Sequence, residues 1–161
     1  MITVYIFISE TCGVCKRAID PILPELYAEL IPRGIKVVRV EFSNRPLTYF
    51  PREPLRKLQI PFVYKGLCGT PMIVIHKEGL SPRTIFGGLA NPEDTRYQIV
   101  FQISLLMLEE FIDNEESRIF FLINMMMLAE NQNLPIYYLI DLIRDEMKKR
   151  KLDEIMEERL P

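Results

Sequence analysis

The feature that most constrains the fold is a cysteine pair, Cys12-Gly-Val-Cys15, placed between an apolar run and a helical pattern. The run at residues 2–8 is rich in β-branched and aromatic residues and too short to favour a helix, so it predicts a buried central strand. Residues 15–31 carry apolar side chains at a period near 3.6, which predicts a helix, kinked at Pro21 and Pro24. The two thiols therefore lie at a strand-to-helix turn.

This position suits the cysteines for redox chemistry. Two thiols at this spacing can form a disulfide that closes a small loop. The first turn of a helix presents free backbone N–H groups and the positive end of the helix dipole, which stabilise a thiolate on Cys12. A stabilised thiolate is the nucleophile of thiol–disulfide exchange. Zinc sites use the same C-x-x-C spacing, so the spacing alone leaves metal binding open.

A zinc site at the pair needs further ligands, for which Cys68 and His76 are the candidates. Residues 71–75 are predicted to form a strand that leads away from the cysteines, which puts His76 about 15 Å away, in a turn. Cys68 can approach the pair, either as an accessory redox thiol or as a small buried hydrophobe. We therefore expect no metal, and no cofactor beyond the Cys12–Cys15 disulfide.

Charge divides the chain of 161 residues into two parts. Residues 1–91 carry 12 basic and 7 acidic side chains, a net charge of +5, whereas residues 92–161 carry 8 and 15, a net charge of −7. Such a change in composition indicates a boundary. Together with the element pattern it predicts one domain at residues 1–114 and a helical extension at residues 115–161.

Composition predicts a cytoplasmic protein. The odd count of 3 cysteines is not that of a secreted disulfide scaffold, and the N-terminus lacks a basic signal-peptide region. Few histidines and serines and no tryptophan suit a thermophile, in which cytosolic disulfides are common. No membrane span is expected, because no window of 18 apolar residues lacks a charge. No nucleic-acid partner is expected either, because the single basic run, residues 148–151, lies in the acidic half.

The remaining strands and helices follow from periodicity and turn residues. Three further strands are predicted, at residues 35–42, 71–75 and 83–86. The first follows a helix and so is parallel to residues 2–8, whereas the last two form an antiparallel hairpin. Three helices are predicted, at residues 92–113, 116–131 and 134–150 or beyond. Residues 43–70 are predicted as a long loop with a short helix at residues 54–58; its aromatic residues either line a substrate groove or anchor the loop.

Residues 1–114 resemble the thioredoxin/glutaredoxin superfamily. The resemblance is carried by the order of the elements and by three motifs: Thr11-Cys12-Gly-Val-Cys15-Lys16, Gly69-Thr70-Pro71, and Gly87-Gly88. It implies the α/β thioredoxin-like fold, in which helices flank a four-stranded mixed sheet. It also implies that Pro71 is cis and faces the cysteine pair, and that the backbone of Thr70 pairs with an extended substrate.

The resemblance implies a thiol–disulfide oxidoreductase. Cys12 is then the nucleophile and Cys15 the resolving cysteine, and the implied substrate-binding residues are Gly13, Val14, Thr70, Pro71, Gly87 and Gly88. The expected partners are a disulfide-containing protein or small thiol, a reductase or electron donor, and, through residues 115–161, a second copy of the chain. The alternative is a non-enzymatic adaptor or redox sensor that binds a partner through the extension.

Overall fold

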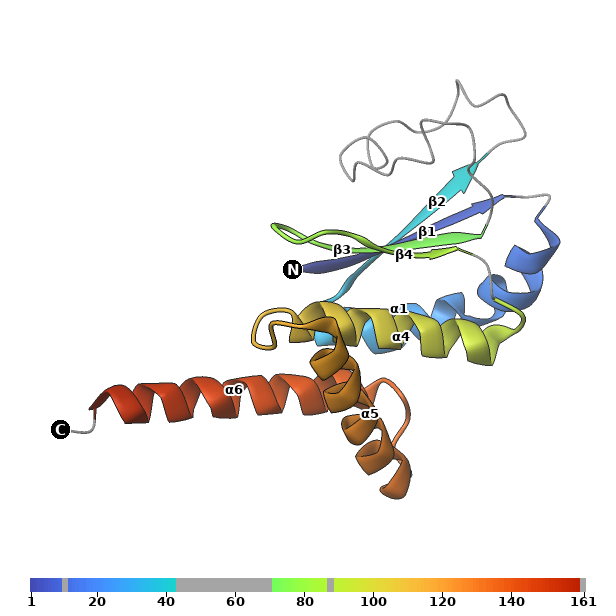
Figure 1. The fold of residues 1–161 in the computed structure, drawn as a ribbon. Coiled ribbons are helices and arrows are strands. Elements are labelled where there is room, and N and C mark those ends of the chain that lie inside the picture. The colour runs from blue at the N-terminus through green and yellow to red at the C-terminus, as the bar shows by residue number, and fades with distance from the viewer. Residues whose placement is uncertain (10–11, 43–70, 87–88, 160–161) are drawn as a thin grey trace. The chain divides into compact units, whose positions relative to one another are not determined.

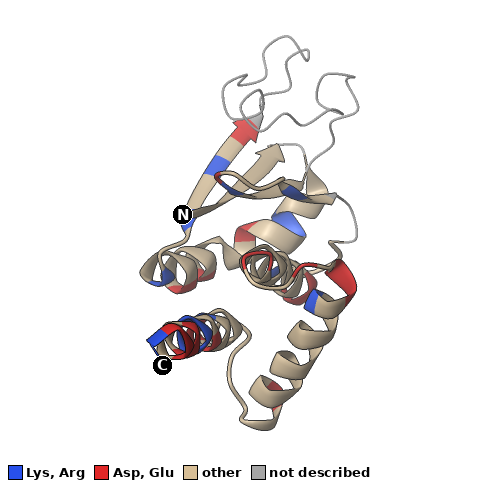
Figure 2. Cartoon of the chain, turned by 60° about the vertical axis from the view of Figure 1, so that its left-hand side comes forward, with Lys and Arg blue, Asp and Glu red and all other residues tan. Residues whose placement is uncertain are grey.

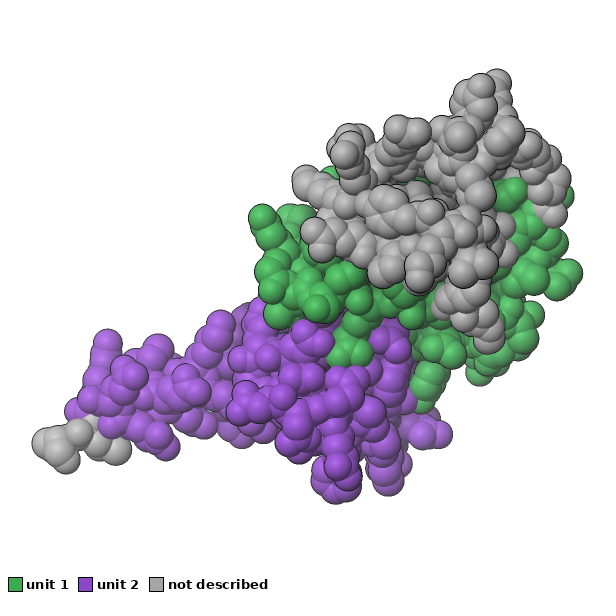
Figure 3. Space-filling model, turned by 45° about the horizontal axis from the view of Figure 1, so that its top comes forward, with its two compact units in different colours: residues 1–99 green, residues 100–161 purple. Residues whose placement is uncertain are grey.

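The computed structural model describes residues 1–9, 12–42, 71–86 and 89–159 (Figure 1). The predicted loop at residues 43–70, with its short helix, lies outside the described residues. The chain divides into two compact units, residues 1–99 and 100–161 (Figure 3). The division falls within helix α4 (Pro92–Leu108). The predicted domain boundary at residue 115 stays a prediction.

A four-stranded sheet with the order β2-β1-β3-β4 is the centre of the first unit. Its strands are β1 (Ile2–Ser9), β2 (Lys36–Phe42), β3 (Met72–Lys77) and β4 (Arg83–Phe86). β1 pairs in parallel with β2 and antiparallel with β3, and β3 pairs antiparallel with β4. The predicted mixed sheet, with its parallel first pair and its hairpin, is confirmed.

β1 is central in the sheet, as its apolar sequence predicts. Val4, Ile6, Phe7 and Ile8 are buried, whereas the side chains before Ile6 alternate between buried and partly exposed. Only the second half of β1 is therefore buried on both faces, which corrects the prediction that the whole strand is. The fully buried half is the one that leads to the cysteines.

The segment after the cysteines is helical but irregular. It consists of a π-helical turn η1 (Cys15–Ile19), a 3-10 turn η2 (Asp20–Ile22), helix α1 (Leu23–Leu30) and a 3-10 turn η3 (Ile31–Arg33). Pro21 and Pro24 lack the N–H that would donate to the preceding turn, so the α-helical bonding is regular only after them. The predicted kink is confirmed. Gly34 ends the segment with a left-handed φ of 77°, which costs glycine little.

The beginning of α4 packs near α1 within the first unit, on the same side of the sheet (Figure 1). Arg96 on α4 donates through Nε to both carboxylate oxygens of Glu25 on α1, at 2.9 and 3.1 Å. Asn91 caps α4 because its Oδ1 accepts a hydrogen bond from the backbone N–H of Asp94 at 2.9 Å. The helix start predicted at Asn91-Pro92 is confirmed.

The second unit contains the rest of α4 and two further helices, α5 (Glu115–Asn131) and α6 (Tyr138–Arg159). Every residue from Ile103 to Leu108 is buried, so the last turns of α4 are covered on all sides. α4 ends at Leu108, five residues before the predicted end. In the turn that follows, the N–H groups of Glu110 and Phe111 bond three residues back instead of four. Among the described residues no helix is long and apolar enough to cross a membrane.

Candidate active site

Cys12 and Cys15 form a disulfide. They lie where the chain passes from the carboxyl end of β1 into the helical segment (Figure 1). Their Cα atoms are 5.2 Å apart, within the range that a disulfide spans. The backbone N–H of Cys12 donates to the carbonyl of Ser9 at 3.1 Å, which turns the chain directly after the strand. The strand-to-helix turn predicted for the pair is confirmed.

The environments of the two sulfurs differ. Cys15 is only 1 % exposed, whereas Cys12 is partly exposed. The backbone N–H of Cys15 donates to Sγ of Cys12, with 3.0 Å between N and S. A backbone N–H in this position is a donor of the kind that favours a negatively charged acceptor. Cys12 is therefore the more accessible cysteine of the two, and its sulfur is the one with a backbone donor directed at it.

The strand register brings one further predicted site residue, Pro71, to the same edge of the sheet. Phe7 on β1 pairs with Met72 on β3, and Met72 pairs with Phe86 on β4. Pro71, directly before Met72, is buried, so it lies at the edge where β1 ends. Thr70, Gly87, Gly88 and Cys68 lie outside the described residues.

His76 lies at the opposite end of the sheet from the cysteines. It is paired with Thr3 near the beginning of β1, and it belongs to β3, which corrects the prediction that it is a turn residue. The strand continues two residues beyond the predicted end because the backbone of Lys77 still pairs with Ile2. Among the described residues, no group of three or more His, Cys, Asp and Glu side chains could hold a metal ion.

The arrangement of these elements decides the fold class. A mixed sheet in the order β2-β1-β3-β4 has a C-x-x-C disulfide directly after β1 and a buried proline directly before β3. The fold is thioredoxin-like. Among solved structures, oxidized thioredoxin O2 from Arabidopsis thaliana is similar, with 18% identity and a TM-score of 0.41 over 69% of this chain and 75% of that chain. No family model and no curated protein matches the sequence.

The turn that holds the cysteines has a basic side chain that sequence reasoning missed. Gly13 is exposed and Val14 partly exposed, between the two cysteines. A methyl group placed on Gly13 would lie 3.4 Å from Nη1 of Arg17, so the Arg17 guanidinium folds back over the turn that holds the cysteines. Lys16, which follows Cys15 directly, is the other basic residue next to the pair. Arg17 is the cation for which the structure gives a position over this turn.

We expect Arg17→Glu to slow alkylation of reduced Cys12 at neutral pH by about two- to fivefold, because replacing a nearby positive charge by a negative one disfavours the thiolate. The measurement is the rate of iodoacetamide labelling of Cys12, followed by peptide mapping. Lys36→Glu is the matched control, because Lys36 is exposed and pairs with Thr3 at the far end of β1. Equal rates in the two variants would show that Arg17 does not act on this sulfur.

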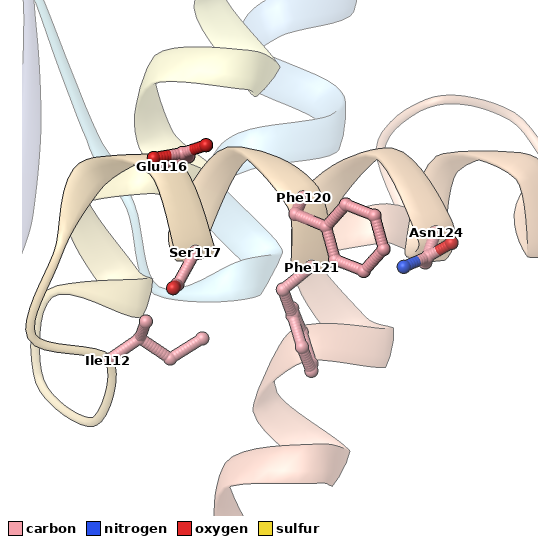
Figure 4. A pocket seen from close by; sticks show the side chains of 6 residues that line it. All are labelled: Ile112, Glu116, Ser117, Phe120, Phe121 and Asn124. Carbon is pink, nitrogen blue, oxygen red and sulfur yellow. The ribbon is translucent and has the colours of Figure 1, made fainter.

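The second unit has a shallow pocket at the N-terminal half of α5 (Figure 4). It is lined by Ile112, Glu116, Ser117, Phe120, Phe121 and Asn124. The Arg150 guanidinium of α6 lies 5.4 Å from the centre of the Phe121 ring and 5.0 Å from that of Phe111, a cation–π arrangement that holds α6 against α5. The lining contains no cysteine, so the pocket has no group for thiol–disulfide exchange.

Proposed function

We propose that the protein is a thiol–disulfide oxidoreductase in which Cys12 is the nucleophile and Cys15 the resolving cysteine. The observation that carries the proposal is the N–H of Cys15 directed at Sγ of Cys12 at 3.0 Å. It combines with the contrast between a partly exposed Cys12 and a buried Cys15. Attack on a substrate needs an accessible thiolate, whereas resolution needs only a thiol next to the first sulfur.

The proposed reaction has two exchange steps. The Cys12 thiolate attacks one sulfur of a substrate disulfide, so that a Cys12–substrate bond forms, the substrate disulfide breaks and the other substrate sulfur leaves as a thiolate. Cys15, after losing its proton, attacks Sγ of Cys12, and the second substrate sulfur leaves. The substrate gains two electrons and two protons, and the protein becomes the Cys12–Cys15 disulfide. A dithiol reductant then reduces the Cys12–Cys15 disulfide. The same residues oxidise a substrate dithiol when the reduction potentials of protein and substrate favour that direction.

Protein disulfides and small-molecule disulfides are the proposed substrate classes. The burial of Pro71 at the edge where β1 ends supports a role for this edge in substrate binding. Gly13 and Val14 line the same turn between the cysteines, so they are the first residues that an incoming disulfide meets. The proposal extends to Thr70, Gly87 and Gly88 through the family resemblance, and Cys68 remains an accessory thiol at most.

A turnover assay tests this function. With dithiothreitol as the reductant, we expect catalytic amounts of the protein to accelerate the reduction of insulin, followed by the turbidity of the released chains. Protein whose reduced cysteines have been alkylated with iodoacetamide is the control, and it should not accelerate the reaction. No acceleration by unmodified protein, where an established thioredoxin works under the same conditions, would rule out the enzyme.

The second candidate is an adaptor or redox sensor without turnover, which binds a partner through the helical extension. This candidate is favoured by four apolar side chains of α5 that are exposed: Phe120, Ile123, Met127 and Leu128. Met127 is the last of three consecutive methionines, which begin at Met125. The insulin assay separates the candidates, because the adaptor predicts a Cys12–Cys15 disulfide that forms and breaks without accelerating the reduction of insulin.

A further inference from the structure

The side chain of Arg17 reaches back over the turn between the two cysteines. Long side chains of a helical segment lean toward its N-terminus, so Arg17 extends toward Gly13, four residues earlier. The 3.4 Å between Nη1 of Arg17 and a methyl group placed on Gly13 fixes the position of the guanidinium. Both residues are exposed, so a substrate has access to this group. A positive charge therefore lies over the residue that directly follows Cys12.

The carboxylates of the described residues leave this charge without an ion pair. In the helical segment after β1 the basic side chains come first and acidic side chains follow (Figure 2). Glu25, the first acidic residue of α1, pairs with Arg96 at 2.9 Å. Among the described residues Arg17 forms no ion pair, and this includes Asp20 of the same segment. The guanidinium is therefore available to a carboxylate of a substrate.

A substrate that is joined to Cys12 brings its own residues within reach of Arg17. The two Cα atoms of a disulfide are about 5.5 to 6 Å apart, and neighbouring Cα atoms of a chain are about 3.8 Å apart. The residues on either side of the substrate cysteine therefore have Cα atoms at most about 14 Å from that of Gly13. A glutamate side chain that extends toward the guanidinium brings the two charges within the Debye length of about 10 Å.

We propose that Arg17 selects disulfides whose cysteines have acidic neighbours. The inference rests on the oxidoreductase function proposed above and names the substrate class of that site, which is peptides and proteins with Asp or Glu beside the disulfide. A guanidinium presents a planar fork of N–H donors that fits a carboxylate, and it repels a basic side chain in the same place. Arg17 takes no part in the exchange steps, so it is a specificity-determining residue.

Two peptides with one intramolecular disulfide each test the preference. They differ only beside the cysteines, where one has glutamate and the other has lysine. The measured quantity is the second-order rate constant with which each peptide oxidises the reduced full chain, divided by the constant with which it oxidises dithiothreitol. Dithiothreitol also attacks as a thiolate, so the division removes differences in reactivity between the two peptide disulfides. We expect the wild type to prefer the glutamate peptide at least about fivefold at low salt, and less at about 0.5 M salt.

Arg17→Glu is expected to abolish or reverse this preference, because attraction to the glutamate peptide becomes repulsion. An effect of Arg17 on the Cys12 thiolate changes the rates of both peptides alike and cancels in their ratio. The ratio therefore reports the selection of substrate alone. Lys36→Glu is the matched control, since it makes the same change of charge at the far end of β1, and we expect it to keep the preference of the wild type.

The outcomes separate this inference from the function on which it rests. Equal normalised rates for the two peptides with the wild type, or a preference that Arg17→Glu leaves unchanged, would overturn the role of Arg17 while the exchange activity stands. If neither peptide reacts with the reduced protein faster than with dithiothreitol, the oxidoreductase function itself fails, and the inference fails with it. Circular dichroism checks that both variants keep the helix content of the wild type.

Discussion

Cys12→Ser is expected to lower the catalysed reduction of insulin to the level of the buffer control, a loss of at least about a hundredfold. Serine keeps the size of the side chain but its hydroxyl cannot form a disulfide. The N–H of Cys15 that lies 3.0 Å from Sγ of Cys12 then has no thiolate to stabilise. The measurement is the initial rate of insulin reduction with dithiothreitol.

Cys15→Ser is expected to lose turnover for a different reason. Cys12 still attacks, but nothing resolves the mixed disulfide, so a covalent protein–substrate adduct accumulates. Cys68→Ser is the matched control, because it also removes one thiol, and we expect it to retain most of the turnover. The assignment of roles is wrong if Cys12→Ser and Cys15→Ser accumulate the same adducts, or if Cys68→Ser is the variant that loses activity.

Phe7→Ala is expected to lower the free energy of unfolding by about 3–5 kcal/mol. Phe7 has no exposed surface and lies on β1, in the half that is buried on both faces, so its removal leaves a cavity in the centre of the sheet. Urea denaturation followed by circular dichroism measures the change.

Tyr5→Ala is the matched control for Phe7→Ala. The two rings stack with their centroids 6.4 Å apart, but Tyr5 is partly exposed. We expect it to cost less than about 1.5 kcal/mol, because less apolar surface returns to water. A cost for Tyr5→Ala equal to that for Phe7→Ala would show that the core is not centred on the buried half of β1.

The strands of the first unit could be predicted because their signals are local. β-branched runs and short turns place β1 to β4 within two residues of their observed bounds. The irregularity after the cysteines was also predictable, since Pro21 and Pro24 lack donors whatever the tertiary contacts. The π-helical form of its first turn was not, because periodicity does not distinguish hydrogen bonds to the fourth and fifth preceding residues.

The bounds of the later helices were less predictable. Apolar side chains continue past Leu108, so α4 was expected to reach residue 113, but the chain turns where the buried residues end. α6 begins at Tyr138 instead of residue 134, because the N–H groups of Tyr138, Leu139 and Ile140 bond three residues back and form a tighter turn before the α-helical bonds begin. It continues to Arg159 since charged residues with good helix propensity fill its last turns.

The part of the candidate site that depends only on residue type and spacing could be predicted from the sequence. The spacing of Cys12 and Cys15 and their position after a strand identify them as the candidate redox pair. The position of Arg17 depends on how a long flexible side chain folds back, which spacing does not encode. The assignment of His76 to a turn was wrong because its strand continues as long as β1 provides backbone partners.

The attacking role of Cys12 is the central claim, and trapping tests it most directly. Reduced Cys15→Ser protein is mixed with a peptide that contains one disulfide, quenched with acid, digested and mapped by mass spectrometry. We predict that the peptide is joined to Cys12 in essentially every adduct. Adducts on Cys68, or no adduct while free Cys12 remains accessible to iodoacetamide, would contradict the claim.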